Sequence, residues 1–200
     1  MKEEILKTAL NQFVSNGIRE MSVQKLVSIL RISTKTFYKY FENKEELLKE
    51  ALRLHYDLQY IEFEKQVIEK NPVILFYEVW QTATLKEYTV NNRFFAELSY
   101  YYPALQQEIE REIGSKFWEK LRQIIEDGNA QGFFKNDIKP YIVLESIALL
   151  LNSISRTDKF LKYNSSAEEI FCNSIAVLIK GICTSTGLDI LEKHIGNKSK

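Results

Sequence analysis

Apolar residues near the start of the chain recur every three or four positions, which is the spacing of one face of an α-helix. The first run lies between residues 3 and 16. It consists of Ile5, Leu6, Ala9, Leu10, Phe13 and Val14. Gly17 is well placed to end this helix, because glycine tolerates the left-handed backbone that often follows a last turn. The pattern therefore predicts an amphipathic helix at the N-terminus.

Two short helices are predicted next, with a tight turn between them. Ser22 precedes the second apolar run and Ser33 precedes the third. Either hydroxyl can cap a helix by accepting a hydrogen bond from a free backbone N–H. The second run is Val23, Leu26, Val27 and Leu30. Phe37 and Phe41 lie one turn apart in the third and are expected to pack inward. With the break at residues 31–32, the pattern predicts two helices joined by a turn.

A long fourth helix is predicted to begin at Asn43 or Lys44 and to continue to about Glu69. Glu45 and Glu46 fall in its first turn, where carboxylates interact favourably with the positive end of the helix dipole. We place a domain boundary inside this helix because the N-terminal part is small. The boundary gives one domain of residues 1–50 and another of residues 51–200.

Prolines and glycines divide the rest of the chain into five more helical patterns. Proline is disfavoured inside a helix but is accepted in its first turn. The patterns run approximately over 72–88, 91–101, 103–129, 140–159 and 166–185. No strand-length alternating run bounded by hairpin residues occurs in the sequence. The chain is therefore predicted to be all-α.

Composition agrees with a globular helical protein, since 45% of the residues are hydrophobic and 27% are charged. No apolar run approaches the roughly 20 residues of a membrane span, and the first ten residues lack the apolar core of a signal peptide. Cys172 and Cys183 lie eleven residues apart on one predicted helix, too far for a disulfide. Free thiols without an export signal predict a cytoplasmic protein that does not associate with membranes.

Charge is concentrated on the two short helices. Residues 22–44 carry five cations and one anion, a net charge of +4, whereas the whole chain is formally neutral. The third helix is also rich in hydroxyl groups. A basic, hydroxyl-rich short helix that follows a helix and a turn is what binding in a DNA major groove requires.

A run of spaced features covers the first quarter of the chain in order and without gaps. The features are the Ile5/Ala9/Phe13 stripe, Gly17, Ser22-Val23, Leu26-Val27, Ile32-Ser33, the block Thr36–Phe41 and the block Asn43–Leu48. In these residues the chain resembles the TetR family of bacterial transcriptional regulators. The resemblance implies a helix-turn-helix DNA-binding domain of three helices and the start of a fourth, followed by a helical ligand-binding and dimerisation domain.

The chain departs from the family at Arg31, which stands where glycine is usual in the turn. A left-handed backbone at Arg31 would cost some stability that glycine would not. Alternatively, the turn has a slightly different geometry. Both alternatives leave the flanking pattern intact.

The resemblance places the third helix in the major groove of double-stranded DNA. Lys35 has the reach to donate to a guanine edge, and a threonine methyl can contact a thymine methyl. Lys44 is expected to hold a phosphate together with free N–H groups of the fourth helix. The residues expected to contact bases or phosphates are Ser22, Ser33, Thr34, Lys35, Thr36, Tyr38, Lys39, Tyr40 and Lys44.

Several of these residues have a second interpretation. Ser22 and Ser33 are expected to cap helices whatever else they do. The ring of Tyr40 can instead pack inward with one edge in solvent, and Lys39 can be merely solvated.

The two helical patterns near the C-terminus are apolar on more than one side, so they are predicted to be buried on both sides. One side can face the domain's own core and the other a second subunit, which agrees with the four-helix dimer interface usual in the family. The residues predicted to face the partner are Ile147, Leu151, Ile154, Ile175, Leu178 and Ile182. The alternative is a helix fully buried within a monomer.

Aromatic residues are dense in the predicted C-terminal domain, and some are expected to line a pocket for an apolar or aromatic molecule. The candidate pocket residues are Trp80, Phe95, Tyr101, Trp118 and Asn152. The aromatic ones can equally be ordinary core residues. Asn152 is polar within an apolar helix, so it can anchor a ligand or meet its counterpart across a dimer.

Three hypotheses follow. The first is a homodimeric, ligand-responsive repressor that binds a near-palindromic operator, and the second is a dimeric DNA-binding regulator with a filled core and no effector. The third is a small-molecule-binding or catalytic helical protein that no longer binds DNA, which the basic cluster disfavours. An enzyme is not expected, because His55 and His194 lie far apart and the chain has no phosphate-binding glycine loop or serine elbow. No cofactor or metal is predicted.

Overall fold

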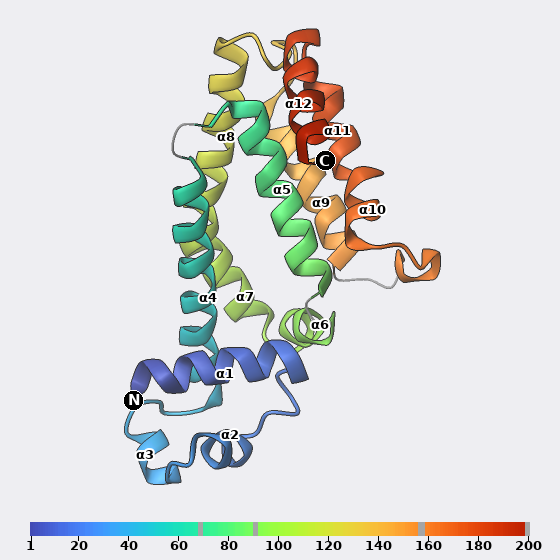
Figure 1. Ribbon diagram of the computed structural model, residues 1–200. Coiled ribbons are helices and arrows are strands. Elements are labelled where there is room, and N and C mark those ends of the chain that lie inside the picture. Colours follow the sequence, from blue (N-terminus) through green and yellow to red (C-terminus); the bar gives the residue numbers. More distant parts are fainter. Residues whose placement is uncertain (68–69, 90–91, 156–158, 199–200) are drawn as a thin grey trace. The chain divides into compact units, whose positions relative to one another are not determined.

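In the computed structural model the chain is all-α, as predicted (Figure 1). The structure describes residues 1–67, 70–89, 92–155 and 159–198. Within these ranges there is no β-strand, and β-type pairing is limited to an isolated antiparallel bridge between Phe134 and Cys183. None of the helices in the described ranges is both long and apolar enough to cross a bilayer.

The four N-terminal helices confirm the predicted pattern. They are α1 (Lys2–Asn16), α2 (Val23–Leu30), α3 (Thr34–Tyr38) and α4 (Lys44–Val67). Asn43 caps α4, because its Oδ1 accepts a hydrogen bond from the Glu46 N–H at 2.9 Å. The predicted end of this helix, at Glu69, lies outside the described residues.

The later helices follow the proline boundaries. They are α5 (Pro72–Thr89), α6 (Asn92–Tyr101), α7 (Pro103–Ile109), α8 (Ser115–Ala130), α9 (Pro140–Ser155), α10 (Ala167–Cys172), α11 (Ile175–Ile182) and α12 (Ser185–Lys198), with a π-helical turn η1 (Glu110–Gly114) and a 3-10 turn η2 (Leu161–Tyr163). The single helix predicted over 103–129 is thus interrupted by a π-helical turn.

The prediction of a single helix over 166–185 is wrong. The segment contains two helices, α10 and α11, which are separated by Asn173 and Ser174. The Asn173 amide donates to the Glu169 carbonyl at 2.7 Å, and the Ser174 hydroxyl donates to the Ile170 carbonyl at 2.5 Å. The Ser174 hydroxyl thus gives the Ile170 carbonyl a partner near the end of α10, whereas the Glu169 carbonyl also accepts the Asn173 N–H at 3.0 Å. Cys172 is consequently exposed at the end of α10 rather than in the core, whereas Cys183 is buried at the end of α11.

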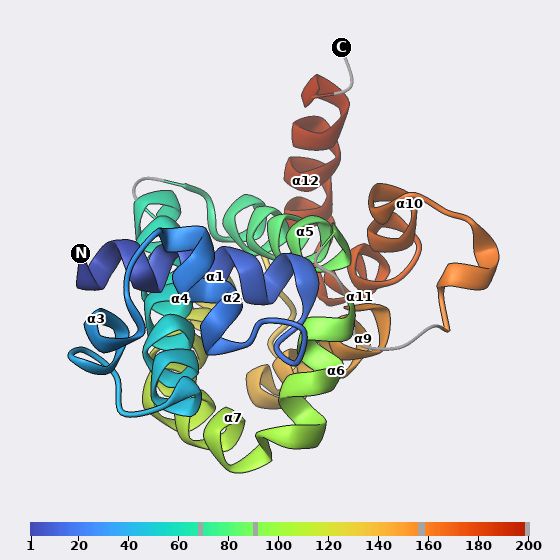
Figure 2. The ribbon, with the colours of Figure 1, turned by 90° about the horizontal axis from the view of Figure 1, so that it is seen from below.

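The chain divides into two compact units. Unit 1 consists of residues 1–62 and 90–115, and unit 2 of residues 63–89 and 116–200. Unit 1 therefore contains the predicted domain of residues 1–50 together with α6 and α7. Figures 1 and 2 both place α6 beside the C-terminal end of α1.

The core of unit 1 is built from the apolar stripes of its helices. Phe13 of α1 is fully buried, as are Phe37 and Phe94, and Phe41 is almost so. Full burial of a side chain of this size stabilises a fold by roughly 1.5–3 kcal/mol. The inward packing predicted for Phe37 and Phe41 is confirmed, and it fixes which side of α3 is left for solvent.

The core of unit 2 forms around α5, which contacts α9, α10, α11 and α12. Phe76 of α5 packs edge-on against Phe134, with ring centroids 5.8 Å apart, and Tyr77 packs against Phe171 at 5.0 Å. Edge-to-face aromatic pairs of this kind add to the free energy of apolar burial. The dense aromatic residues of this region are in large part core residues.

Candidate nucleic-acid interface

Serine side chains cap both short helices of unit 1. The Ser22 hydroxyl accepts a hydrogen bond from the Lys25 N–H at 3.2 Å, and the Ser33 hydroxyl accepts one from the Thr36 N–H at 3.0 Å. The Ser33 and Thr36 hydroxyl oxygens also lie 2.8 Å apart. The capping role predicted for both serines is confirmed, and it fixes where α3 begins.

The turn between α2 and α3 uses a left-handed residue. Arg31 has φ 55° and ψ 39°, and its N–H bonds to the carbonyls of Val27 and Ser28. Of the two alternatives for this position, the structure adopts the left-handed one. A non-glycine residue in this conformation costs about 1–2 kcal/mol, so unit 1 carries a strain that glycine would relieve.

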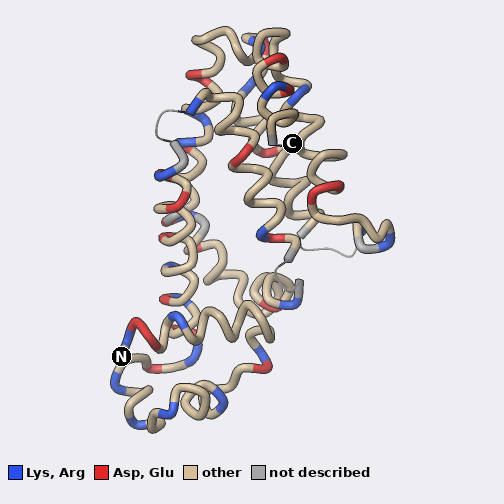
Figure 3. The backbone as a smooth tube through the Cα atoms, viewed as in Figure 1, with Lys and Arg blue, Asp and Glu red and all other residues tan. Residues whose placement is uncertain are grey.

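The outward side of α3 is polar and basic. Thr34, Lys35 and Lys39 are exposed, and Tyr38 is 53% exposed while its ring packs edge-on against Phe37 at 5.2 Å. Figure 3 shows Lys and Arg positions along the α2–α3 segment. A shallow hollow of about 490 Å³ lies on this surface. It is lined by Ser33, Lys35, Thr36, Tyr38 and Lys39.

We call this surface the α3 face. It brings together five of the residues predicted to bind DNA, and it presents ammonium, hydroxyl and phenol groups side by side. These groups can donate to phosphates and to the acceptor edges of bases.

Tyr40 and Lys44 are turned inward. Tyr40 is half-buried against the core of unit 1, as the second interpretation of that residue proposed. The Lys44 ammonium donates to the Ile18 carbonyl at 2.6 Å. Burial lowers the pKa of Lys44, while Glu97 opposes this shift and Arg19 adds to it. One of the three N–H donors of Lys44 therefore has an internal partner, and the phosphate contact predicted for this residue stays a prediction.

An acid on α6 holds the α1–α2 connection, which comprises residues 17–22. Glu97 is only 7% exposed, and its Oε2 accepts a hydrogen bond from the Arg19 N–H at 2.7 Å. Its Oε1 accepts one from Arg93 Nε at 2.8 Å. This contact was not predicted, since the local sequence signal for it is limited to the i,i+4 spacing of Arg93 and Glu97.

The predicted pocket residues fall in different settings. In unit 1, Phe95 is buried in the core, and the exposed Tyr101 accepts a hydrogen bond from Arg19 Nη1 at 2.8 Å. In unit 2, Trp118 and Asn152 are exposed, whereas Trp80 is only 4% exposed. The indole N–H of Trp80 has no hydrogen-bond partner among the described residues.

Most residues predicted to face a partner subunit are buried in unit 2 itself. Ile147 is 0% exposed, because α9 and α11 both pack against α5. Leu151, Ile154, Ile175 and Ile182 are likewise buried, and Leu178 is exposed. Large apolar side chains are exposed on other sides of these helices. They are Ile142 and Leu149 on α9 and Val177 and Leu178 on α11.

We call these four residues the α9–α11 face. Asn152 is exposed one turn beyond Leu149, and both roles predicted for it stay predictions. Among the described residues, no group of three or more His, Cys, Asp or Glu side chains is arranged to hold a metal ion.

Residues 5–51 match the family model described as "Bacterial regulatory proteins, tetR family". A search of curated proteins found no match. Among solved structures, the chain is similar to a TetR family regulator from Cytophaga hutchinsonii, with a TM-score of 0.72 and 18% identity over 92% of this chain and 95% of that chain.

Two further structures are similar in fold. The reduced form of NemR from E. coli gives a TM-score of 0.70 and 20% identity over 92% of this chain and 97% of that one. FadR from Bacillus subtilis in complex with stearoyl-CoA gives a TM-score of 0.70 and 18% identity over 91% of this chain and 100% of that one. At these identities the likeness is one of fold, and it extends along most of the chain.

Proposed function

We propose that the chain is a DNA-binding regulator of the TetR family that acts as a homodimeric repressor of a near-palindromic operator, because residues 5–51 match the model of that family. In this proposal a small apolar or aromatic molecule releases the repressor from DNA. The observation that carries the proposal is the α3 face, whose exposed groups are suited to a major groove. Two copies of α3 would read half-sites whose centres lie one helical turn apart, roughly 34–36 Å.

Within the α3 face the side chains have different tasks. Lys35, at the leading end of α3, is proposed to read a guanine edge, with Thr34 beside it. Tyr38 and Lys39, one turn further along, are proposed to bind phosphates. Base contacts set sequence preference, whereas phosphate contacts set register and affinity.

Lys35→Ala is expected to relax base preference at one position of each half-site, because the guanine contact is lost. The cost is about 1–3 kcal/mol per half-site on the preferred sequence. Lys39→Ala should instead weaken all sequences similarly and reduce the slope of affinity against salt by about one per subunit. Selection from a randomised half-site library, followed by fluorescence anisotropy at several salt concentrations, measures both effects.

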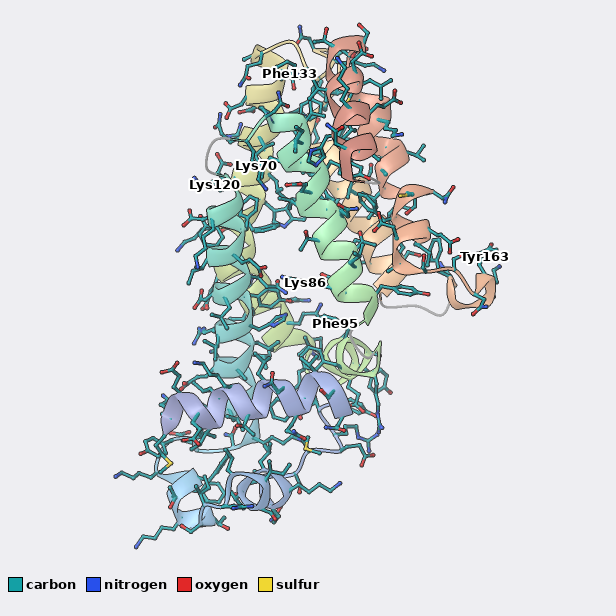
Figure 4. The ribbon with its side chains drawn as sticks, in the orientation of Figure 1. Lys70, Lys86, Phe95, Lys120, Phe133 and Tyr163 are labelled. Carbon is teal, nitrogen blue, oxygen red and sulfur yellow. The ribbon has the colours of Figure 1, made fainter. Side chains whose placement is uncertain are left out.

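Lys120→Ala serves as the matched control, because Lys120 is an exposed lysine on α8 in unit 2 (Figure 4). It should change neither base preference nor the salt slope. Equal losses of base preference in the Lys35 and Lys39 variants would contradict the assigned tasks. Absence of any duplex binding by the unaltered protein would contradict the proposed function itself.

The effector part of the proposal is supported by Trp80. A buried donor without a partner costs about 1–3 kcal/mol, and a ligand that carries a hydrogen-bond acceptor would recover it. FadR, which is similar in fold, is seen with stearoyl-CoA, an apolar chain with many acceptor groups. The alternative, a regulator with a filled core and no effector, predicts that Trp80 never meets a ligand.

Trp118→Phe leaves Trp80 as the one tryptophan of the chain, so ligand binding can be followed by its fluorescence. Stearoyl-CoA and a panel of aromatic acids are then titrated with and without operator. An effector should weaken operator binding by a coupling of about 1–3 kcal/mol, and operator should weaken effector binding by the same factor. A ligand that alters Trp80 emission but leaves operator affinity unchanged would favour the effector-free alternative.

A further inference from the structure

We infer that Glu97 of α6, with Arg93, is a positioning residue for DNA binding, because it fixes the α1–α2 connection from which α2 and α3 begin. The inference rests on the proposed function and adds to it a residue that is remote in sequence from the α3 face. It concerns contacts within unit 1 alone.

Both oxygens of the Glu97 carboxylate are occupied. One accepts from the backbone N–H of Arg19, and the other from the Arg93 guanidinium. The side chain of Glu97 is 9% exposed, so its carboxylate is largely shielded from water, whereas the side chain of Arg93 is about half exposed. A bond to a backbone N–H fixes the path of the main chain, whatever the conformation of the Arg19 side chain.

The contact continues from α6 to α2 through charged groups. Arg93 Nη2 donates to Glu20 Oε1 at 2.9 Å, and Glu20 Oε2 lies 3.7 Å from the ammonium of Lys25 in the first turn of α2. Hydrogen bonds to Glu97 and Glu20 raise the pKa of Arg93, and the Arg93 contact lowers the pKa of Glu20. A series of alternating charges therefore joins α6 to the helix that precedes the α3 face.

Two other residues, Gly17 and Lys44, also help to hold the α1–α2 connection close to its neighbours. Gly17 has φ +86°, and a Cβ at that position would lie 3.1 Å from both Glu97 Oε2 and Arg93 Cδ. Glycine suits this conformation, which other residues rarely adopt, and a Cβ would require the Glu97 and Arg93 side chains to shift. Lys44, the first residue of α4, binds the Ile18 carbonyl from another direction. The connection is held by α6 and α4 together.

Recognition of DNA requires contact groups to be held within about 0.5 Å of a productive position. The two copies of α3 must also meet half-sites at one fixed spacing. A loosened α1–α2 connection would let α2 and α3 adopt several orientations, and only one of these orientations would fit the major groove of the half-site. The expected signature is lower affinity for the preferred operator together with weaker discrimination between half-site spacings.

The experiment compares Glu97→Gln with the unaltered protein on operators whose spacer is native, one base pair shorter or one longer. Glutamine has nearly the same size as glutamate. Its amide NH2 group cannot accept a hydrogen bond, so one of the two donors, the Arg19 N–H or Arg93 Nε, would lose its acceptor. We expect the variant to bind the native spacing at least about tenfold more weakly and to prefer it less strongly. Glu3→Gln is the matched control, because Glu3 is an exposed acid whose ion pair is with Lys7 of the same helix.

The spacing series separates positioning from a simple loss of folded protein, which would lower binding to all three operators by one factor. Arg93→Lys keeps the charge at a half-exposed position but removes the planar fork. It is expected to change spacing preference in the same direction as Glu97→Gln. If both variants keep the spacing preference and affinity of the unaltered protein, the inference is wrong although the proposed function stands. If the unaltered protein binds no operator, the proposed function fails first.

Discussion

Leu149→Glu is expected to separate the two subunits of the proposed dimer and thereby to remove tight operator binding. Leu149 is 62% exposed in the protomer and stands on the α9–α11 face. A two-fold interface would bury two copies of the new carboxylate, and an uncompensated buried charge costs about 3–5 kcal/mol. The dimer dissociation constant should therefore rise by at least about 100-fold. Sedimentation velocity over a range of concentrations measures the change, and anisotropy with the operator measures its consequence.

Two comparison variants make this test specific. Tyr163→Glu alters an aromatic side chain of similar exposure in η2, outside the α9–α11 face, and should leave the dimer intact (Figure 4). Ile147→Glu places a charge in the core of unit 2, so it should unfold that unit rather than yield a folded monomer. A Leu149→Glu protein that remains a dimer of unchanged affinity would move the interface away from α9.

Local sequence signals were sufficient to predict α2 and α3. Ser22 and Ser33 cap helices through hydrogen bonds to residues three positions away, and Phe37 and Phe41 pack inward from one face of one segment. Both relations lie within a few residues, so spacing alone predicts them. The same holds for the exposure of Lys35.

Relations between distant segments were not predictable in the same way. In the sequence Lys44 is a cation at the N-terminus of a helix, but in the structure its ammonium donates to the Ile18 carbonyl, 26 residues earlier in the chain. The two sides of α9 are both apolar, so hydrophobic pattern could not tell that Ile147 faces the core and Leu149 faces outward. The bond from Glu97 to the Arg19 N–H spans 78 residues. In each case the outcome depends on contacts between segments that are distant in sequence, and the hydrophobic pattern of one segment does not contain them.

The last helix, α12, was not predicted, because its position is set by packing against another connection. Phe133 and Phe134 follow α8, and their backbone meets the α11–α12 connection (Figure 4). The Thr184 N–H donates to the Phe133 carbonyl at 2.9 Å, and the Thr184 hydroxyl accepts from the Gly187 N–H at 3.2 Å. Thr184 thus caps α12 and ties it to the turn after α8.

Gly187→Ala is expected to destabilise unit 2 by about 3 kcal/mol or more. A Cβ at Gly187 would lie 2.1 Å from the Phe133 carbonyl oxygen, a backbone atom that cannot move without displacing the whole connection. Urea denaturation followed by tryptophan fluorescence measures the loss, because Trp80 and Trp118 both belong to unit 2.

Gly196→Ala in the same helix is the matched control, since a Cβ there meets nothing within 4 Å. It should leave stability unchanged or raise it by about 0.4–1 kcal/mol, because alanine reduces the conformational entropy of the unfolded chain. Opposite effects of one methyl group on one helix would show that α12 is held by its contact with Phe133 rather than by helix propensity. If both substitutions raise stability, the backbone of the Phe133 connection yields to the added methyl group, and α12 is not fixed by it.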